Sequence, residues 1–98
     1  MKLKWTRPAM ADRREIRNYI ARDNVSAAIR MDKLFGSKAA VLLEHPRLGR
    51  HGRKAGTREL VVHQNYILIY DLAGDDLVRI LRVLHGARQW PPAVQTDW

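Results

Sequence analysis

The sequence has no cysteine, few acidic residues and no long apolar segment. The lack of cysteine excludes disulfides and thiol chemistry and is compatible with a reducing cytoplasm, where we expect this protein to act. No apolar run is longer than that of Tyr66–Tyr70, which is far too short to cross a membrane, so we expect no membrane partner. Met1–Arg7 carries charges with no apolar core after them, which argues against a signal peptide.

The most informative feature of the composition is an excess of positive charge. Eighteen lysines and arginines face ten aspartates and glutamates, which gives 98 residues a net charge of +8. Such an excess indicates an anionic partner, either a nucleic acid or an acidic protein or both. The length and the 46% hydrophobic content predict one folded domain, assigned to residues 1–91, with an irregular tail over 92–98.

The first quarter of the chain predicts a strand and a helix. In Lys2–Thr6 apolar and polar residues alternate, and the lysines suit the edge of a sheet. From Ala9 to Arg22 the spacing is helical. The stripe expected to face the core comprises Ile16, Tyr19 and Ile20, extended backwards by Ala9 and Asp12. The arginines of this helix are assigned to its solvated faces: Arg13, Arg14, Arg17 and Arg22.

A second helix is predicted over Ala27–Leu43, where apolar residues recur at spacings of three and four. Asn24 is its expected N-cap, because its side chain can accept from a free backbone N–H. Pro46 ends the helix near Glu44, since proline cannot continue the hydrogen-bond ladder. The short break between the two helices predicts an antiparallel helical hairpin.

The segment Arg47–Arg58 holds three glycines, five basic residues and no acid. This composition predicts a flexible basic loop, which is either simply solvated or a binding site for phosphate groups. The residues that we assign to nucleic-acid or target binding are Arg47, Arg50, Arg53, Lys54 and Arg58.

Three strands are predicted after this loop, over Glu59–His63, Tyr66–Leu72 and Leu77–Leu84, separated by short turns. Such spacing favours an antiparallel meander with one face packed on the helical hairpin and the N-terminal strand added at an edge. The predicted fold class is therefore α+β.

Several segments, taken in this order, resemble the RelE/ParE superfamily of toxins. The likeness covers roughly residues 2–91. The segments that carry it are Tyr19–Asn24 followed by Ala27–Ala28, Pro46-x-x-Gly49-Arg50, Gly56–Val62, Tyr66–Tyr70 and Val83–Pro91.

The resemblance implies the toxin half of a bacterial type II toxin–antitoxin pair. Toxins similar to RelE cleave mRNA on the ribosome, whereas those similar to ParE poison DNA gyrase and are not nucleases. Both are held inactive in hetero-oligomers by a cognate antitoxin, expected here to be acidic and amphipathic. No cofactor is implied, and the scattered histidines show no metal-ligand spacing.

A nuclease of this family would need a base, an acid and cations around the phosphate. His85 is the acid–base candidate, Arg88 and Arg58 are candidates for holding the phosphate, and Tyr70 is a further donor. Each also has a structural interpretation, because a histidine at a strand end usually makes a structural hydrogen bond. Arg88 can equally stack on Trp90.

One residue departs from the nuclease pattern. Nucleases similar to RelE carry an arginine where this sequence has Ile67, and isoleucine can neither hold a phosphate nor assist proton transfer. The expected function is therefore gyrase inhibition. A ribosome-dependent mRNA endonuclease is the first alternative, and a non-toxic nucleic-acid-binding module is the second.

Overall fold

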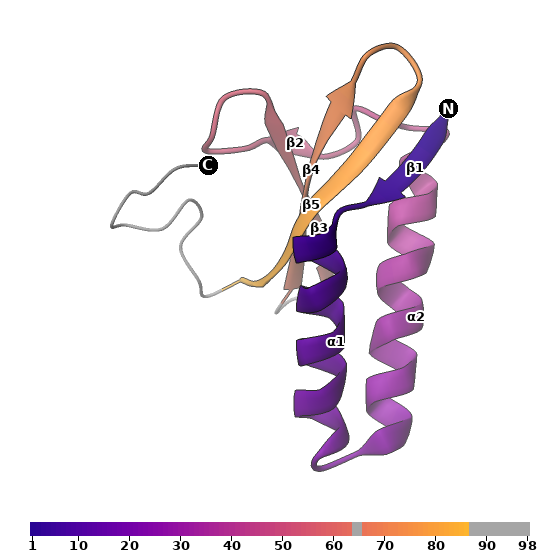
Figure 1. Cartoon of the computed structure of the whole chain (residues 1–98), viewed down its shortest axis with the longest axis vertical. Helices are drawn as coiled ribbons and strands as arrows, with labels where there is room; N and C mark the ends of the chain where they lie inside the picture. The colour runs from indigo at the N-terminus through magenta and orange to yellow at the C-terminus, as the bar shows by residue number, and fades with distance from the viewer. Residues whose placement is uncertain (64–65, 87–98) are drawn as a thin grey trace.

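The computed structural model describes residues 1–63 and 66–86 (Figure 1). The two helices and one mixed sheet form an α+β fold, as the sequence predicts. In chain order the elements are β1 (Lys2–Trp5), α1 (Arg7–Ala21), α2 (Val25–Val41), β2 (Arg50–His51), β3 (Thr57–His63), β4 (Tyr66–Ala73) and β5 (Leu77–His85). The predicted C-terminal tail and the turn at residues 64–65 lie outside the described residues.

The described strands form one sheet in the order β1-β5-β4-β3-β2. β3, β4 and β5 pair antiparallel, which confirms the meander. β1 lies at one edge, as expected, and pairs parallel with β5. β2 at the other edge was not predicted, because a strand of two residues within a glycine-rich segment has no periodicity to detect.

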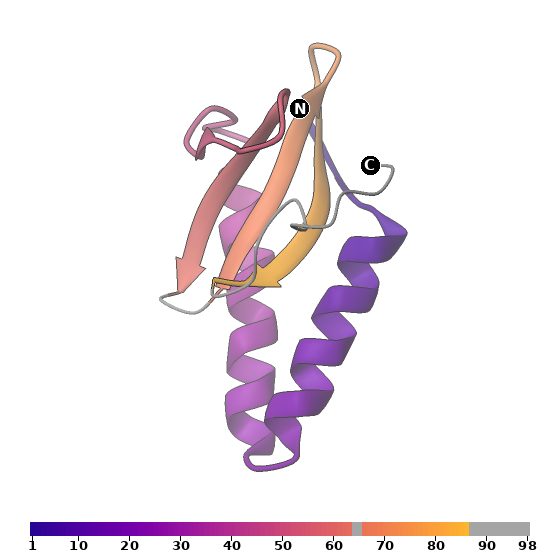
Figure 2. The ribbon, with the colours of Figure 1, turned by 90° about the vertical axis from the view of Figure 1, so that its left-hand side faces the viewer.

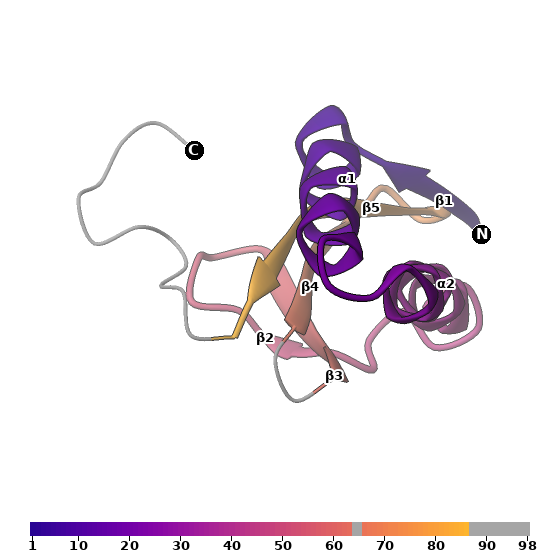
Figure 3. The same ribbon diagram turned by 90° about the horizontal axis from the view of Figure 1, so that it is seen from below.

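Both helices lie on the same side of the sheet (Figures 2 and 3). Alternate residues of β4, including Leu68 and Tyr70, share a buried core with Phe35 of α2 and Ala9 of α1. The predicted packing of the meander on a helical hairpin is therefore confirmed.

Side-chain caps fix the first residue of each helix. The Asn24 side chain accepts from the Ala27 N–H at 2.9 Å, which confirms the predicted N-cap. Thr6 does the same for α1 through the Ala9 N–H, so α1 begins at Arg7 rather than at Ala9. Thr6 also donates its hydroxyl to the Ile80 carbonyl, which ties the start of α1 to β5.

The connected ends of α1 and α2 extend past the sheet (Figure 1). Tyr19, predicted to face the core, is consequently 67% exposed, because no strand lies opposite it. Val25 and Ile29 at the start of α2 are exposed for the same reason. Periodicity finds the apolar side of a helix but does not show where its partner ends.

Arg13 corrects the assignment of all four arginines to solvated faces. Its guanidinium lies over the Trp5 ring, 4.4 Å from the centroid, and Nε donates to Asp32 at 3.0 Å. This cation–π contact and ion pair join β1, α1 and α2. Arg13 therefore has a structural role between the layers.

The face of the sheet opposite the helices is called the distal face below. A smaller apolar cluster of Ile69 and Leu84, with Ile67 and Leu81 packed against it, lies on this face. It continues along the strands into a cross-strand pair in which Arg79 holds both carboxylate oxygens of Asp71, at 2.9 and 2.6 Å. The Asp71 carboxylate raises the pKa of Arg79 through these hydrogen bonds.

Candidate functional site

The basic segment predicted as a flexible loop is a β-hairpin, residues 47–58, called the basic hairpin below. The N–H of Gly52 donates to the Thr57 carbonyl at 2.8 Å, and the N–H of Thr57 returns to the Lys54 carbonyl at 3.1 Å. The Thr57 hydroxyl donates to the same Lys54 carbonyl at 2.6 Å. Gly56 has φ +83°, a left-handed conformation that glycine adopts without strain.

Tyr70 anchors the base of the basic hairpin from inside the core. Its hydroxyl accepts from the Gly49 N–H at 2.9 Å and donates to the Pro46 carbonyl at 2.8 Å. Burial raises the Tyr70 pKa, although the Gly49 hydrogen bond and the charge of Arg58 act in the opposite direction. The side chain has no exposed surface, so its expected role as a donor to substrate is replaced by a structural one.

Replacing Tyr70 with phenylalanine is expected to lower the free energy of unfolding by about 1–3 kcal/mol. The buried Gly49 N–H would lose its acceptor while the ring stayed in place. Urea unfolding of Tyr70→Phe measures the change. Tyr19→Phe, which removes an exposed hydroxyl, should change stability by less than about 0.5 kcal/mol, and equal losses in the two variants would contradict this role.

Arg58 lies beside Tyr70 and donates hydrogen bonds to the backbone of the basic hairpin. Its Nη1 donates to the carbonyl of Gly49 at 2.8 Å and to that of Arg47 at 3.2 Å. Arg58, the residue predicted to hold a phosphate, thus uses Nη1 to bind the backbone at the start of the basic hairpin. Arg50 pairs with the buried carboxylate of Glu59 through Nε and Nη2, while most of its own side chain remains exposed.

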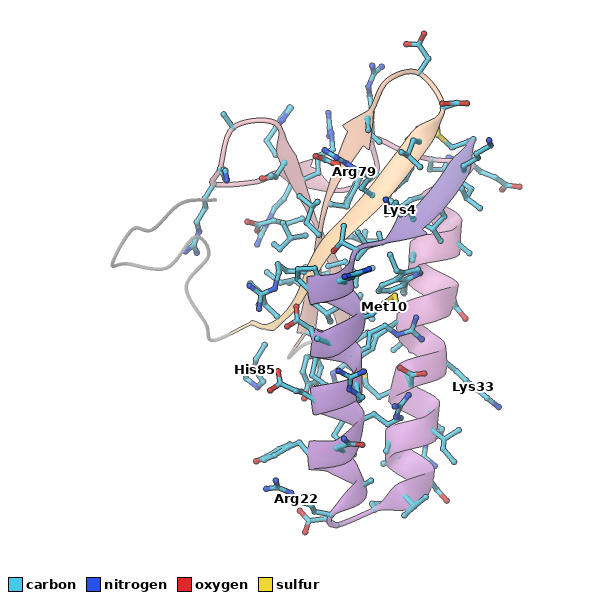
Figure 4. All side chains as sticks on the ribbon, in the orientation of Figure 1. Lys4, Met10, Arg22, Lys33, Arg79 and His85 are labelled. Atoms are coloured by element: carbon cyan, nitrogen blue, oxygen red, sulfur yellow. The ribbon has the colours of Figure 1, made fainter. Side chains whose placement is uncertain are left out.

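His85 lies at the opposite end of the sheet, beside α1 (Figure 4). It is exposed, and its ring meets the edge of Tyr66 with centroids 5.4 Å apart. These two rings line a groove with residues of α1 that include Asp12, Glu15 and Tyr19. Arg88 lies outside the described residues.

Among the described nuclease candidates, the structure places Arg58 beside Tyr70 but far from His85. Arg58 is paired with Tyr70 in the sheet register, and His85 is paired with Tyr66. The two positions are four residues apart on β4, or about 13 Å at the usual rise of a strand. Arg58 and His85 therefore cannot act on one phosphate in this arrangement.

Asp12 is buried, as expected of the core-facing stripe of α1, but its hydrogen-bond partners were not predicted. Its carboxylate accepts from Arg82 Nε and Nη2 at 2.7 and 3.0 Å and from the Val83 N–H at 2.9 Å. Asp12 is 5% exposed, and its hydrogen bonds raise the pKa of Arg82. Val83 lies three residues beyond Ile80, the last residue of β5 paired with β1, so Asp12 satisfies a backbone N–H that β1 does not reach.

Residues 1–63 and 66–86 contain neither a cluster of metal-ligating side chains nor a membrane-spanning helix. No three histidine, aspartate or glutamate side chains in these ranges are placed to hold a metal ion. Among the same residues, neither helix is long and apolar enough to span a membrane.

This chain is similar to a family of toxins and to two proteins that carry toxin names. The family described as ParE toxin of type II toxin–antitoxin system, parDE, matches residues 3–90. A protein of Sinorhizobium fredii named "Putative toxin Y4kP" is 40% identical over 91 residues, which cover 92% of this chain and 93% of that protein. Toxin RelE2 of Caulobacter vibrioides is 43% identical over 84 residues, covering 86% and 93% respectively.

Solved structures show the same fold. The chromosomal ParDE toxin–antitoxin system of P. aeruginosa contains a chain with a TM-score of 0.76 and 25% identity, and the match covers 87% of this chain and 95% of that one. YafQ of E. coli matches with a TM-score of 0.59 and 21% identity over 88% of this chain and 93% of its own.

Proposed function

Because this chain belongs to the ParE toxin family of type II toxin–antitoxin systems, we propose that it stops growth by inhibiting DNA gyrase and does not cleave RNA. The observation that carries this proposal is the composition of the distal face. Ile67, where a nuclease similar to RelE would place arginine, packs there against Ile69 and Leu84. An apolar cluster supplies neither a general base nor a cation for the phosphate.

The charged groups described on and around the distal face also favour this proposal. Arg79 is bound to Asp71, Arg82 to Asp12 and Arg50 to Glu59, each through two guanidinium nitrogens. A cation that stabilises a transition state must direct its N–H groups at the position where charge develops on the phosphate. These three arginines instead serve carboxylates of the protein itself.

One finding favours the alternative, an mRNA endonuclease. Toxin RelE2 is 43% identical to this chain and carries a name from the nuclease branch. His85 would be the acid–base group, since it is exposed beside the groove that Glu15 also lines. The two proposals differ in whether the toxin performs a chemical step.

His85→Ala separates these proposals. On translating ribosomes we expect neither the parent toxin nor the variant to cut mRNA. Inhibition of gyrase by His85→Ala should weaken by less than about tenfold, because an exposed side chain outside a hot spot contributes about 1.4 kcal/mol or less to binding. His63→Ala, which removes another exposed histidine, is the control. Codon-positioned cuts by the parent that disappear in His85→Ala would establish the nuclease instead, since losing a general acid or base costs about 10²- to 10⁴-fold.

We also propose that a cognate acidic antitoxin holds this toxin in an inactive hetero-oligomer. Tyr19, Val25 and Ile29 expose apolar surface where the connected helix ends extend past the sheet, and an amphipathic helix would cover them. The net charge of +8 favours an acidic partner. The similar P. aeruginosa chain comes from a ParDE system, and YafQ is known in complex with DinJ.

Association with this antitoxin is expected to be fast and sensitive to salt. Attraction between opposite charges steers the encounter, so the association rate should fall about tenfold or more between 0.05 and 0.5 M salt. Stopped-flow fluorescence at several salt concentrations measures it, and the dissociation rate should change much less. Association rates that stay flat across this range would show that steering by charge is absent.

A further inference from the structure

The basic hairpin, residues 47–58, concentrates positive charge on an ordered ribbon. It carries five basic side chains, and Arg50, one of them, is bonded to the buried carboxylate of Glu59. Residues 47–59 thus hold five positive charges and one negative charge, a net +4 in a protein whose total is +8. Half of the net charge therefore lies on one edge of the sheet.

The hairpin is fixed to the core at its base and closed at its tip. Tyr70 and Arg58 hold the backbone of residues 47–49, and the Thr57–Lys54 hydrogen bonds close the turn. Gly49 and Gly52 leave no room for a side chain, since a Cβ at Gly49 would lie 2.7 Å from Tyr70 Cε1 and a Cβ at Gly52 would overlap Thr57 Oγ1. The hairpin is already ordered in the folded protein, so binding a ligand does not require the entropy loss of ordering a loop.

The position of the hairpin leaves it accessible. β2 forms the edge of the sheet farthest from β1, and the turn between β2 and β3 extends away from α1 and α2 (Figures 1 and 3). Arg47, Arg50, His51 and Arg53 are exposed. A rigid two-stranded ribbon with cations along it is a shape that the major groove of B-form DNA admits.

We propose that the basic hairpin binds the phosphate backbone of duplex DNA, so that the toxin contacts the DNA held by gyrase as well as the enzyme. This inference rests on the proposed function for the choice of gyrase-bound DNA. The shape of the hairpin independently favours DNA over duplex RNA, because the major groove of A-form RNA is too narrow to admit a ribbon. Contacts to phosphates predict binding without sequence preference.

The test is direct binding of the purified toxin, made by cell-free synthesis, to a fluorescein-labelled 20-base-pair DNA duplex between 50 and 200 mM salt. Arg47→Gln/Arg53→Gln removes two exposed hairpin cations. Arg14→Gln/Arg30→Gln removes two exposed helical cations and leaves the same net charge, so it is the matched control. Circular dichroism establishes that both variants are folded.

We expect the hairpin variant to bind DNA about tenfold or more weakly at 100 mM salt. The slope of log K against log salt should fall by about two, since each phosphate contact contributes about 0.9. The helix variant should stay within about threefold of the parent. Equal losses in both variants, an unchanged slope, absence of DNA binding by the parent, or preferential binding to duplex RNA would each overturn the inference.

Failure of this inference and failure of the proposed function give different results. If gyrase is inhibited but the toxin alone does not bind duplex DNA through the hairpin, the inference is wrong and the proposed function stands. If the hairpin binds DNA but supercoiling continues at full rate, the DNA site stands and gyrase is not the target.

Discussion

Replacing Asp12 with asparagine is expected to lower the free energy of unfolding by about 3 kcal/mol. The substitution leaves Arg82 without its carboxylate and turns an amide N–H₂ toward a guanidinium or toward the Val83 N–H. Breaking a largely buried ion pair by removing one partner typically costs about 3–5 kcal/mol, and Arg82, which is 24% exposed, places the estimate at the lower end. This is a large fraction of the stability of a small domain.

Chemical unfolding followed by circular dichroism measures this loss. Glu44→Gln removes an exposed carboxylate just after α2 and should change stability by less than about 0.5 kcal/mol. A double variant, Asp12→Asn/Arg82→Met, should recover part of the loss because it also removes the guanidinium that lost the Asp12 carboxylate. If Asp12→Asn were as stable as the parent, Asp12 would not be what holds α1 to β5.

Expression of the chain without an antitoxin is expected to stop cell growth, with relaxed or broken plasmid DNA and intact mRNA. Inhibition of gyrase removes negative supercoiling, whereas a ribosome-dependent nuclease would deplete transcripts first. Plasmid topology on chloroquine gels and transcript lengths, both sampled as growth slows, measure the two effects. Co-expression of the protein encoded by a small neighbouring reading frame, if that protein is the antitoxin, should restore growth.

The most direct contradiction of the toxin function is normal growth while folded, soluble chain accumulates. Arrest with cleaved transcripts and normally supercoiled plasmid would confirm a toxin but transfer it to the nuclease branch. The antitoxin control distinguishes specific inhibition from a general burden of overexpression.

The order of helices and strands was predictable because it depends on local periodicity. The alternation of buried and less buried residues in β4 and the apolar spacing of three and four in α2 each involve residues that are close in sequence. Asn24 was identified as a cap for the same reason, since its acceptor role involves residues three positions away.

Features that depend on distant partners were not predictable. Asp12 was placed on the core-facing stripe of its helix, but its partners could not be identified because Arg82 and Val83 lie 70 and 71 residues away. Tyr70 looked like a donor for substrate, and only the fold shows that residues 46 and 49 occupy its hydroxyl. A lone acid within the apolar stripe of a helix was the signal available for Asp12, because burying a charge requires a partner.

The residues of the candidate site were predictable from composition, but their arrangement was not. Composition identified the basic segment, but its ordered hairpin form depends on Tyr70 and on the bonds between Lys54 and Thr57. His85 and Arg58 were grouped by chemistry alone, and the strand register places them apart.

The most direct test of gyrase inhibition uses purified components. Increasing amounts of toxin are incubated with gyrase, ATP and relaxed plasmid, and in parallel with translating ribosomes and a defined mRNA. We expect supercoiling to fall as toxin rises, to be restored by the antitoxin, and the mRNA to remain full length. Supercoiling at its full rate beside mRNA cut at codon positions would contradict the proposal.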